Sequence, residues 1–256
     1  MKPTIGVIGT GDFATYLIGA LRKGGHDGRI LLSPYSHKKA EALAERHTCE
    51  VAADEERMLA ESDWIVLAVR PEQLDAALAN LSLLPRHVVI SAVAGTTIAR
   101  LRAKLGEDTP VVRIMPSSYI DTVSGGVIPI YPSSTEVEAV LRTGGTVVTF
   151  DREEQFELSL AGACLSGWVY RFVGTLENWF VERGLSQEQA RLIVAGNIAG
   201  AAGYAMALPA ASLAKISDGI ATEGTFTKAG LDHLLDREAA LLWRQALDIV
   251  YARLSA

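Results

Sequence analysis

The pattern of apolar and polar positions along this 256-residue chain changes near residue 150. Before that point, short runs of aliphatic and β-branched residues alternate with charged stretches whose apolar residues recur at helical spacing. The runs predict strands at 5–8, 30–33, 64–69, 87–92, 111–114, 126–131 and 146–150, with helices at 38–46, 71–78 and 97–105. Strands that alternate with helices predict a mostly parallel sheet with helices on both faces, the α/β class.

The strand signals disappear after residue 151. Helical spacing continues there, and it predicts helices at 153–173, 177–183, 186–208 and 231–254. Ser186 followed by Gln189 predicts a capping box at the start of one of them. We therefore expect two domains: a sheet domain over 1–150 and an all-helical domain over 151–256.

The first predicted strand runs directly into a turn of the form Gly9-x-Gly11-x-x-Ala14, and helix-compatible residues follow over 13–21. Gly9 permits a tight turn, Gly11 lets a pyrophosphate approach the backbone, and Ala14 lets the helix pack closely on the strand. The alternative is a glycine-rich turn in some other α/β protein. A strand before and a helix after this pattern favour a dinucleotide site, with the pyrophosphate at the helix N-terminus.

The end of the second predicted strand indicates which dinucleotide binds. NAD-binding proteins place an Asp or Glu about 20 residues past the glycines, but here no carboxylate appears before Glu41, which should lie along the next helix. Ser33, Ser36 and Lys38 suit a 2′-phosphate through charge-assisted hydrogen bonds. A solvated helix start is an equal alternative for the lysines, and the missing acid is the stronger signal. We expect NADPH rather than NADH.

Composition narrows the class of protein further. Hydrophobic residues make up 49% of the chain, which excludes a disordered protein, and the net charge of −6 argues against a nucleic-acid partner. Cys49 and Cys164 fit reduced thiols, and the five histidines show no ligand spacing, so we expect no metal. The first strand begins almost at once and leaves no room for a signal peptide. We expect a cytoplasmic protein.

Residues 192–214 carry no charge and are long enough to span a bilayer. Glycines, alanines and Pro209 dominate this segment, and large aliphatic residues are few. The spacing of Gly196 and Gly200 occurs in membrane dimers, but it also suits a helix buried at a subunit interface. We expect no membrane partner and a helix that packs against its copy in a homodimer or dimer-based homo-oligomer.

Four segments are similar to motifs of a known family. Ala68-Val69-Arg70-Pro71 is similar to Ala-Val-Lys-Pro, and residues 90–95 are similar to Ile-Ser-x-x-Ala-Gly. Residues 113–119 are similar to Arg-x-Met-Pro-Asn-Thr-Pro, with a departure at Tyr119, and residues 166–170 keep three positions of Ser-Gly-Pro-Ala-Tyr. In this order and spacing the chain resembles the pyrroline-5-carboxylate reductase family nearly from end to end. The resemblance implies a Rossmann domain, a helical dimerisation domain and NADPH-dependent formation of proline.

The departures from the family lie in the segment that should bind the substrate. Residues 222–227 fall on the family's Ser-Pro-Gly-Gly-Thr-Thr or Ser-Pro-Gly-Gly-Ala-Thr and keep Gly224 and Thr227. The resemblance implies that this loop receives the substrate carboxylate on backbone N–H groups and that Thr227 hydrogen-bonds the imine nitrogen. Glu223 adds a negative charge there and Thr225 adds a side chain, so both weaken the case for pyrroline-5-carboxylate itself but not for a reductase.

The chemistry requires a hydride acceptor held near the nicotinamide and a group that stabilises the atom gaining electrons. Thr227 is the candidate for that group, and a helix N-cap is the alternative role for it. By resemblance, Ser166 and Glu177 line the same cavity, although a solvated surface position is the alternative for Glu177.

The candidate site residues form three groups. The catalytic candidates are Thr227 and Ser166. The substrate-binding candidates are Ser117, Glu177, Gly224 and Thr225. The cofactor-binding candidates are Gly9, Thr10, Gly11, Asp12, Phe13, Ala14, Ser33, Ser36, Lys38, Ala68, Val69, Arg70, Pro71, Ala94, Gly95, Met115 and Pro116.

Three functions fit these residues. The first is reduction of pyrroline-5-carboxylate, and the second is reduction of another small imine or carbonyl on the same scaffold. The third is a non-catalytic NADPH-binding regulator, since a fold does not by itself imply a function.

Overall fold

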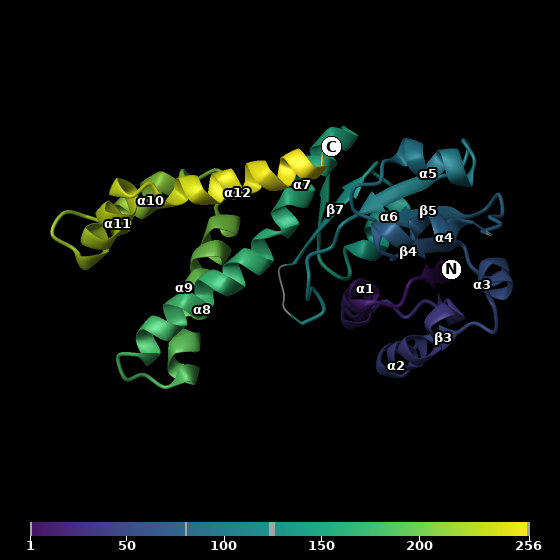
Figure 1. The fold of residues 1–256 in the computed structure, drawn as a ribbon, viewed down its shortest axis with the longest axis horizontal. Helices are drawn as coiled ribbons and strands as arrows, with labels where there is room; N and C mark the ends of the chain where they lie inside the picture. The colour runs from purple at the N-terminus through teal and green to yellow at the C-terminus, as the bar shows by residue number, and fades with distance from the viewer. Residues whose placement is uncertain (1, 80, 123–125, 255–256) are drawn as a thin grey trace. The chain divides into compact units, whose positions relative to one another are not determined.

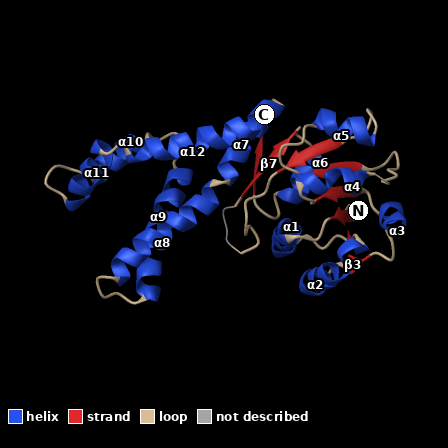
Figure 2. Ribbon diagram, viewed as in Figure 1, coloured by secondary structure: helices blue, strands red, loops and turns tan. Residues whose placement is uncertain are grey.

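The computed structural model describes residues 2–79, 81–122 and 126–254. The chain divides into two compact units, Met1–Ala163 and Cys164–Leu254. The first unit contains the sheet and the second is helical (Figures 1 and 2). The predicted α/β class with a helical C-terminal part is therefore confirmed.

One mostly parallel sheet organises the first unit. In the described residues it has eight strands in the order β3-β2-β1-β4-β5-β6-β7-β8, and only β6 and β7 pair antiparallel. The first six strands have the order of a doubly wound dinucleotide-binding sheet. Their bounds are β1 Ile5–Ile8, β2 Ile30–Leu32, β3 Glu50–Val51, β4 Trp64–Leu67, β5 Val88–Ser91, β6 Val111–Ile114, β7 Val127–Tyr131 and β8 Thr146–Thr149.

Helices cover both faces of this sheet, as the alternation predicts (Figure 2). One apolar core joins α1, α2 and α6 to the strands, and a second core on the other face joins α3, α4 and α5. The bounds are α1 Asp12–Lys23, α2 His37–His47, α3 Glu55–Glu61, α4 Leu74–Leu78, α5 Ile98–Leu105, α6 Thr135–Leu141 and α7 Glu153–Ala163, with 3-10 turns η1 Pro34–Ser36 and η2 Pro71–Gln73.

Strand β3 and helices α3 and α6 of the first unit were not predicted from the sequence. Strand β3 has two residues, and helices α3 and α6 have seven each, too few for a clear period. Asp54 supplies a local signal for α3, because its carboxylate accepts the Arg57 N–H at 2.7 Å as an N-cap.

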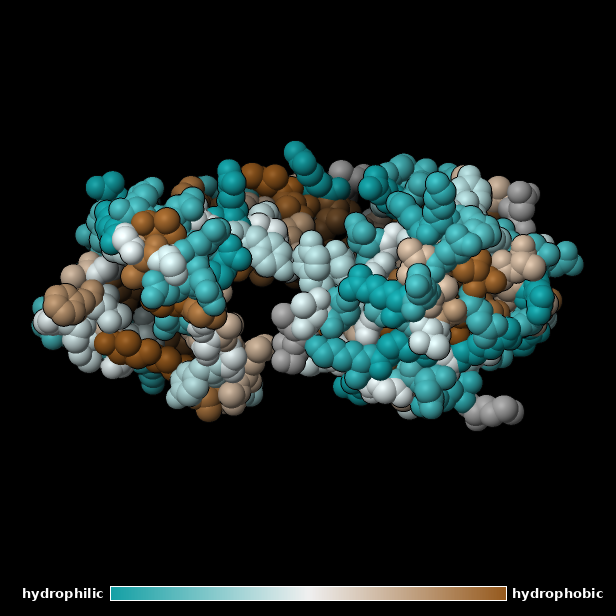
Figure 3. Space-filling view, turned by 90° about the horizontal axis from the view of Figure 1, so that it is seen from below, coloured by the Kyte–Doolittle hydropathy of each residue, from teal (hydrophilic) through white to brown (hydrophobic). Residues whose placement is uncertain are grey.

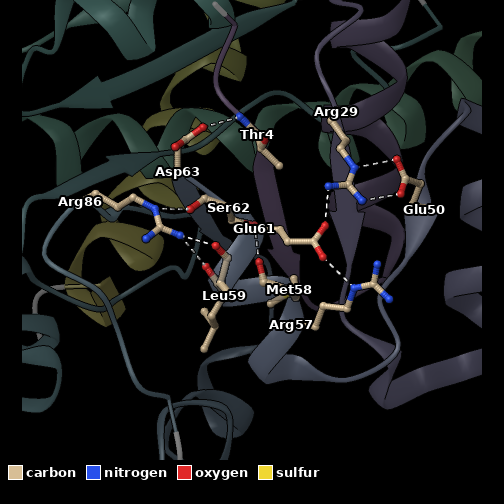
Figure 4. Close-up of polar contacts among 11 residues, drawn as sticks. Thr4, Arg29, Glu50, Arg57, Met58, Leu59, Glu61, Ser62, Asp63 and Arg86 are labelled. Atoms are coloured by element: carbon tan, nitrogen blue, oxygen red, sulfur yellow. Dashed lines mark hydrogen bonds and ion pairs between the residues drawn. The ribbon is translucent and has the colours of Figure 1, made fainter.

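Charged side chains gather at the amino ends of the parallel strands (Figure 4). Arg29 donates to both carboxylate oxygens of Glu50, at 2.8 and 2.7 Å, and also pairs with Glu61. Asp63 accepts the Thr4 backbone N–H at 2.8 Å, just before β1. Such partly exposed pairs contribute little stability each. These contacts lie at the amino ends of the strands. Ligands of doubly wound sheets bind at the opposite, carboxyl ends.

The second unit contains α8 Leu165–Val181, α9 Gln187–Ala207, α10 Leu213–Ile220, α11 Phe226–Asp236 and α12 Ala239–Leu254. Helix α12 packs on α8 through Trp243, whose ring lies 5.8 Å from that of Phe172 and 6.2 Å from that of Trp168. The capping box predicted at Ser186 and Gln189 is confirmed, with both reciprocal hydrogen bonds present.

Several predicted helix bounds were wrong. The predicted helix 153–173 is broken at Cys164, and 177–183 is the continuation of α8. The uncharged segment 192–214 is not one helix, because α9 ends at Ala207, just before Pro209, and α10 follows. The predicted helix 231–254 is interrupted at Glu238, which has a φ of 50°. Among the described helices, none is long and apolar enough to cross a membrane.

Apolar side chains remain exposed on the second unit, where Figure 3 shows hydrophobic residues at the surface. In α9, Leu192 is 68% exposed and Met206 is 64% exposed, and only Ala190 and Val194 are buried. A single chain therefore leaves most of this helix uncovered.

Candidate cofactor and substrate site

The turn between β1 and α1 has the geometry that the glycine pattern requires. Gly9 has a φ of 98°, and a Cβ there would lie 2.5 Å from the carbonyl oxygen of Ala68, so only glycine fits. Ala14 is completely buried where α1 packs on the sheet.

Gly11 lies beside open space. Apart from the two chain neighbours of Gly11, no heavy atom of the described residues lies within 4 Å of a Cβ built there, and no side chain of these residues caps α1. The first N–H groups of α1, at Asp12 and Phe13, therefore face an open cradle. A helix N-terminus with bare backbone before it fits a pyrophosphate, so the residues present fit a dinucleotide.

The end of β2 presents the residues predicted to select the cofactor. Ser33 is buried, and its backbone N–H donates to the Val7 carbonyl at 2.9 Å, which holds it beside β1. Ser36 and Lys38 are exposed at the start of α2. Glu41 lies on α2 as predicted, and its carboxylate pairs with His37 at 3.2 Å. No carboxylate therefore ends β2.

The remaining cofactor candidates follow the carboxyl ends of neighbouring strands. Register places Ile8, Leu67, Ser91 and Arg113 at one level across β1, β4, β5 and β6. The structure thus brings together, at the carboxyl ends of these strands, the candidates that follow them, which are Thr10, Ala68, Val69, Arg70, Pro71, Ala94, Gly95, Met115, Pro116 and Ser117. Their contacts with a cofactor or substrate stay a prediction.

Arg113 is a buried charged residue near the carboxyl end of β6. No role of its own was predicted for it from the sequence. Its side chain is 1% exposed, donates to Glu153 at 2.7 Å and to Glu157, and lies 4.7 Å from the ring centre of Phe156. Glu153 also accepts the Ile98 N–H at 2.8 Å. Arg113 therefore ties β6 to α7 and to the start of α5. Two signals in the sequence pointed to this residue: a charge inside an apolar strand, and its place at the start of the segment that resembles Arg-x-Met-Pro-Asn-Thr-Pro.

In the second unit, Ser166 is half-buried in the first turn of α8. The surface alternative for Glu177, also on α8, is wrong, because Glu177 is 4% exposed. Its carboxylate accepts from Arg191 at 3.0 Å and from Gln187 at 3.2 Å, both on α9. The hydrogen bond from Arg191 holds the pKa of Glu177 below its ordinary value. Glu177 fastens α8 to α9, and a role in substrate binding stays a prediction.

The loop before α11 corrects the alternative role considered for Thr227. Thr225 is the N-cap: its hydroxyl accepts the Lys228 N–H at 3.1 Å and donates to the Thr222 carbonyl at 2.7 Å. Thr227 lies exposed in the first turn of the helix. Gly224 has a φ of 80°, as a tight loop requires. Because two threonines stand two residues apart, the sequence could not show which of them caps the helix.

Comparison with known proteins agrees with this geometry. Residues 4–95 match a family model described as NADP oxidoreductase, coenzyme F420-dependent, and residues 153–256 match one described as pyrroline-5-carboxylate reductase dimerisation. The sheet, the cradle and these matches define an NAD(P)-dependent oxidoreductase.

The relatives specify the family. Pyrroline-5-carboxylate reductase of Pasteurella multocida is 25% identical over 96% of this chain and 94% of its own, and that of Pseudomonas aeruginosa is 29% identical over 80% and 78%. A solved reductase of Streptococcus pyogenes has a TM-score of 0.87 at 22% identity, over 98% of both chains. One from Plasmodium falciparum with NADP bound has a TM-score of 0.86 at 20% identity, over 99% of this chain and 98% of its own. The chain is therefore similar to pyrroline-5-carboxylate reductases along nearly its whole length, and its C-terminal part matches their dimerisation model.

Proposed function

We propose that this protein reduces pyrroline-5-carboxylate to proline with NADPH. The observation that carries the proposal is the open cradle at Gly11, in a chain similar to these reductases along nearly its whole length. When bound, NADPH supplies a hydride to the C=N carbon of the substrate.

The chain's own residues position that cofactor and the substrate. The backbone at Gly11 and the N-terminus of α1 hold the pyrophosphate, while Ser33, Ser36 and Lys38 hold the 2′-phosphate. The segments after β4, β5 and β6 hold the nicotinamide end. The Thr227 hydroxyl donates to the substrate nitrogen as it gains electron density.

A second candidate is reduction of another small imine or carbonyl, which the exposed Glu223 beside Gly224 favours. A carboxylate next to a loop that should receive a substrate carboxylate opposes its binding by like-charge repulsion. A non-catalytic NADPH-binding regulator is the third candidate, and the retained Thr227 speaks against it.

One assay separates these three candidates. The loss of NADPH absorbance is followed with pyrroline-5-carboxylate and with a panel of cyclic imines and keto acids. We expect the highest kcat/KM with pyrroline-5-carboxylate. A higher value with another imine supports the second candidate, and NADPH binding without turnover of any substrate supports the third.

Cofactor preference is tested at the end of β2. We expect NADPH to bind at least tenfold more tightly than NADH, about 1.4 kcal/mol, and Ser33→Asp to reverse that preference, because a carboxylate repels the 2′-phosphate and accepts from ribose hydroxyls. Dissociation constants are measured by titration of both cofactors. Equal values in the wild type would remove this proposal.

We also propose a homodimer or dimer-based oligomer. The match of residues 153–256 to a dimerisation family and the uncovered apolar residues of α9 support it. The partners are otherwise a small-molecule substrate, with neither nucleic acid nor membrane, and a cytoplasmic location remains a prediction from composition.

A further inference from the structure

The segment that follows β6 lies along one side of α1, within the first unit (Figure 1). It contacts α1 at three positions separated by three and four residues, which share one helix face. The rings of Tyr16 and Tyr119 are 4.7 Å apart, and Lys23 Nζ donates to the Thr122 carbonyl at 3.3 Å. Between these contacts, Gly19 faces Asp121.

Gly19 makes this close approach possible. A Cβ there would lie 2.8 Å from the Cβ of Asp121 and 2.9 Å from the ring of His47, which is at the end of α2. Real Cβ atoms essentially never come so close to other heavy atoms, so a side chain at position 19 must displace the segment at Asp121 as well as the His47 ring.

Tyr119 holds the segment in an unusual conformation. Its φ of 58° is left-handed, which is rare for a bulky side chain and persists only where surrounding contacts fix it. Those contacts are the Tyr16 ring and the Thr122 N–H, which donates to the Tyr119 carbonyl at 2.9 Å. The hydrogen bond between the two tyrosine side chains raises the pKa of Tyr16 to about 12, so Tyr16 stays neutral.

The two docked elements carry different parts of the proposed cofactor site. Helix α1 begins at the cradle beside Gly11, about one turn before Tyr16. The segment begins with Met115 and Pro116, and Ser117 is anchored by its N–H, which donates to the Val127 carbonyl at 2.9 Å. Contacts between the two elements therefore fix the spacing between the pyrophosphate end and the nicotinamide end.

We propose that Tyr16, Gly19 and Lys23 dock residues 117–122 on α1 and thereby set the position of the nicotinamide relative to the pyrophosphate cradle, with Tyr119 as a positioning residue. This inference rests on the proposed cofactor site but not on the identity of the imine.

Gly19→Ala is the primary test, and Gly162→Ala is its matched control. Both glycines lie in helices of the same unit, but at Gly162 no heavy atom of the described residues, apart from chain neighbours and the helix's own backbone, lies within 4 Å of a Cβ. For Gly19→Ala we expect kcat to fall about tenfold or more, because misplacing reacting groups by about 1 Å is costly, and NADPH affinity to change less than about threefold. The deuterium isotope effect with NADPH labelled at the transferred hydrogen should rise, because hydride transfer becomes slower than the other steps. Gly162→Ala should match the wild type in every measurement.

Tyr119→Gly and Tyr119→Phe keep the test valid if Gly19→Ala fails to fold. Glycine accepts the left-handed φ and removes the ring, so it should lower kcat and raise the isotope effect as Gly19→Ala does. Phenylalanine keeps the ring contact and should restore most of the rate.

The emission of bound NADPH gives a readout that needs no turnover. A fixed nicotinamide should emit more strongly in the wild type than in Gly19→Ala or Tyr119→Gly at saturating NADPH. If no imine is reduced, the proposed function fails. The comparison of NADPH emission between the wild type and the variants still tests whether docking of residues 117–122 on α1 positions the nicotinamide. Wild-type emission in both variants, or wild-type kcat and isotope effect in both, would overturn the inference.

Discussion

Thr225 and Thr227 stand two residues apart at the start of α11, and the structure separates their roles. Thr225 forms the cap, so the exposed hydroxyl of Thr227 is not needed to begin the helix. A change at Thr227 therefore tests its proposed catalytic role apart from the helix cap.

We expect Thr227→Ala to lower kcat by about tenfold to a few hundredfold, about 1.4–3 kcal/mol, because one hydrogen bond to the reacting atom is lost. Thr227→Ser should keep most of the rate, and NADPH affinity should hardly change. Thr225→Ala should instead cost about 1 kcal/mol of stability as a lost cap. Steady-state kinetics and melting temperatures check all three variants. Normal turnover in Thr227→Ala would exclude its catalytic role.

His87 is a buried group whose charge state is fixed by its hydrogen bonds. Its Nδ1 accepts the Leu84 N–H at 3.0 Å and its Nε2 donates to the Leu59 carbonyl at 2.9 Å, which requires the neutral ring. Burial is the main cause that lowers the pKa of His87. The unfolded chain therefore binds this proton more readily than the folded one.

The stability contributed by neutral His87 is present above its unfolded pKa of about 6.5 and is lost as the pH falls toward the lower folded value. We expect the free energy of unfolding to decrease as the pH is lowered from about 7.5 to about 5.5. His87→Gln should be less stable at neutral pH, and its free energy of unfolding should depend less steeply on pH. Some pH dependence should remain, because the pKa values of His26 and His47 are also lowered in the folded protein. Urea unfolding at several pH values measures both slopes. Identical slopes would contradict the assignment.

At the scale of elements, the two glycines in the turn from β1 to α1 have different roles. Gly9 is required by the backbone and by Ala68, whereas Gly11 has an extended φ and open space around it. One glycine serves the fold and the other serves the proposed cofactor.

We expect Gly9→Ala to lower the melting temperature strongly, because it combines a clash with a left-handed φ that alone costs about 1–2 kcal/mol. Gly11→Ala should melt like the wild type but bind NADPH at least about tenfold more weakly, since its methyl group occupies the cradle. Thermal melts and NADPH titration distinguish the two. A Gly11→Ala protein with wild-type affinity would remove the cradle from the cofactor site.

At the scale of the whole molecule, the uncovered face of α9 points to assembly. Apart from its chain neighbours and its own helix backbone, no heavy atom of the described residues lies within 4 Å of a Cβ at Gly200, so a Cβ there has open space within one protomer. We therefore attribute an effect of a larger residue on assembly to a contact with a second subunit.

We expect Gly200→Leu to overpack the contact between subunits and to release monomers or cause aggregation. Sedimentation velocity at micromolar concentration measures this variant against the wild type. A monodisperse wild-type monomer would contradict the proposed assembly.

The sequence by itself determined the features that depend on neighbours along the chain. Apolar runs indicated β1 and β6 at their observed bounds, and the turn at Gly9 was predictable because a strand, a left-handed glycine and a helix are contiguous. The capping box at Ser186 is local for the same reason. These patterns are set by backbone sterics and by periodicity, which need no distant partner.

Only the tertiary structure decided how charged and strained residues are used. Arg113 is buried because Glu153 and Glu157, 40 and 44 residues later, neutralise it, and Glu177 is buried because Arg191 reaches it from the next helix. Tyr119 keeps its left-handed backbone because Tyr16 lies against it. Removing a charge from water is favourable only with a partner in place, and such partners are brought close by the fold, not by spacing along the chain.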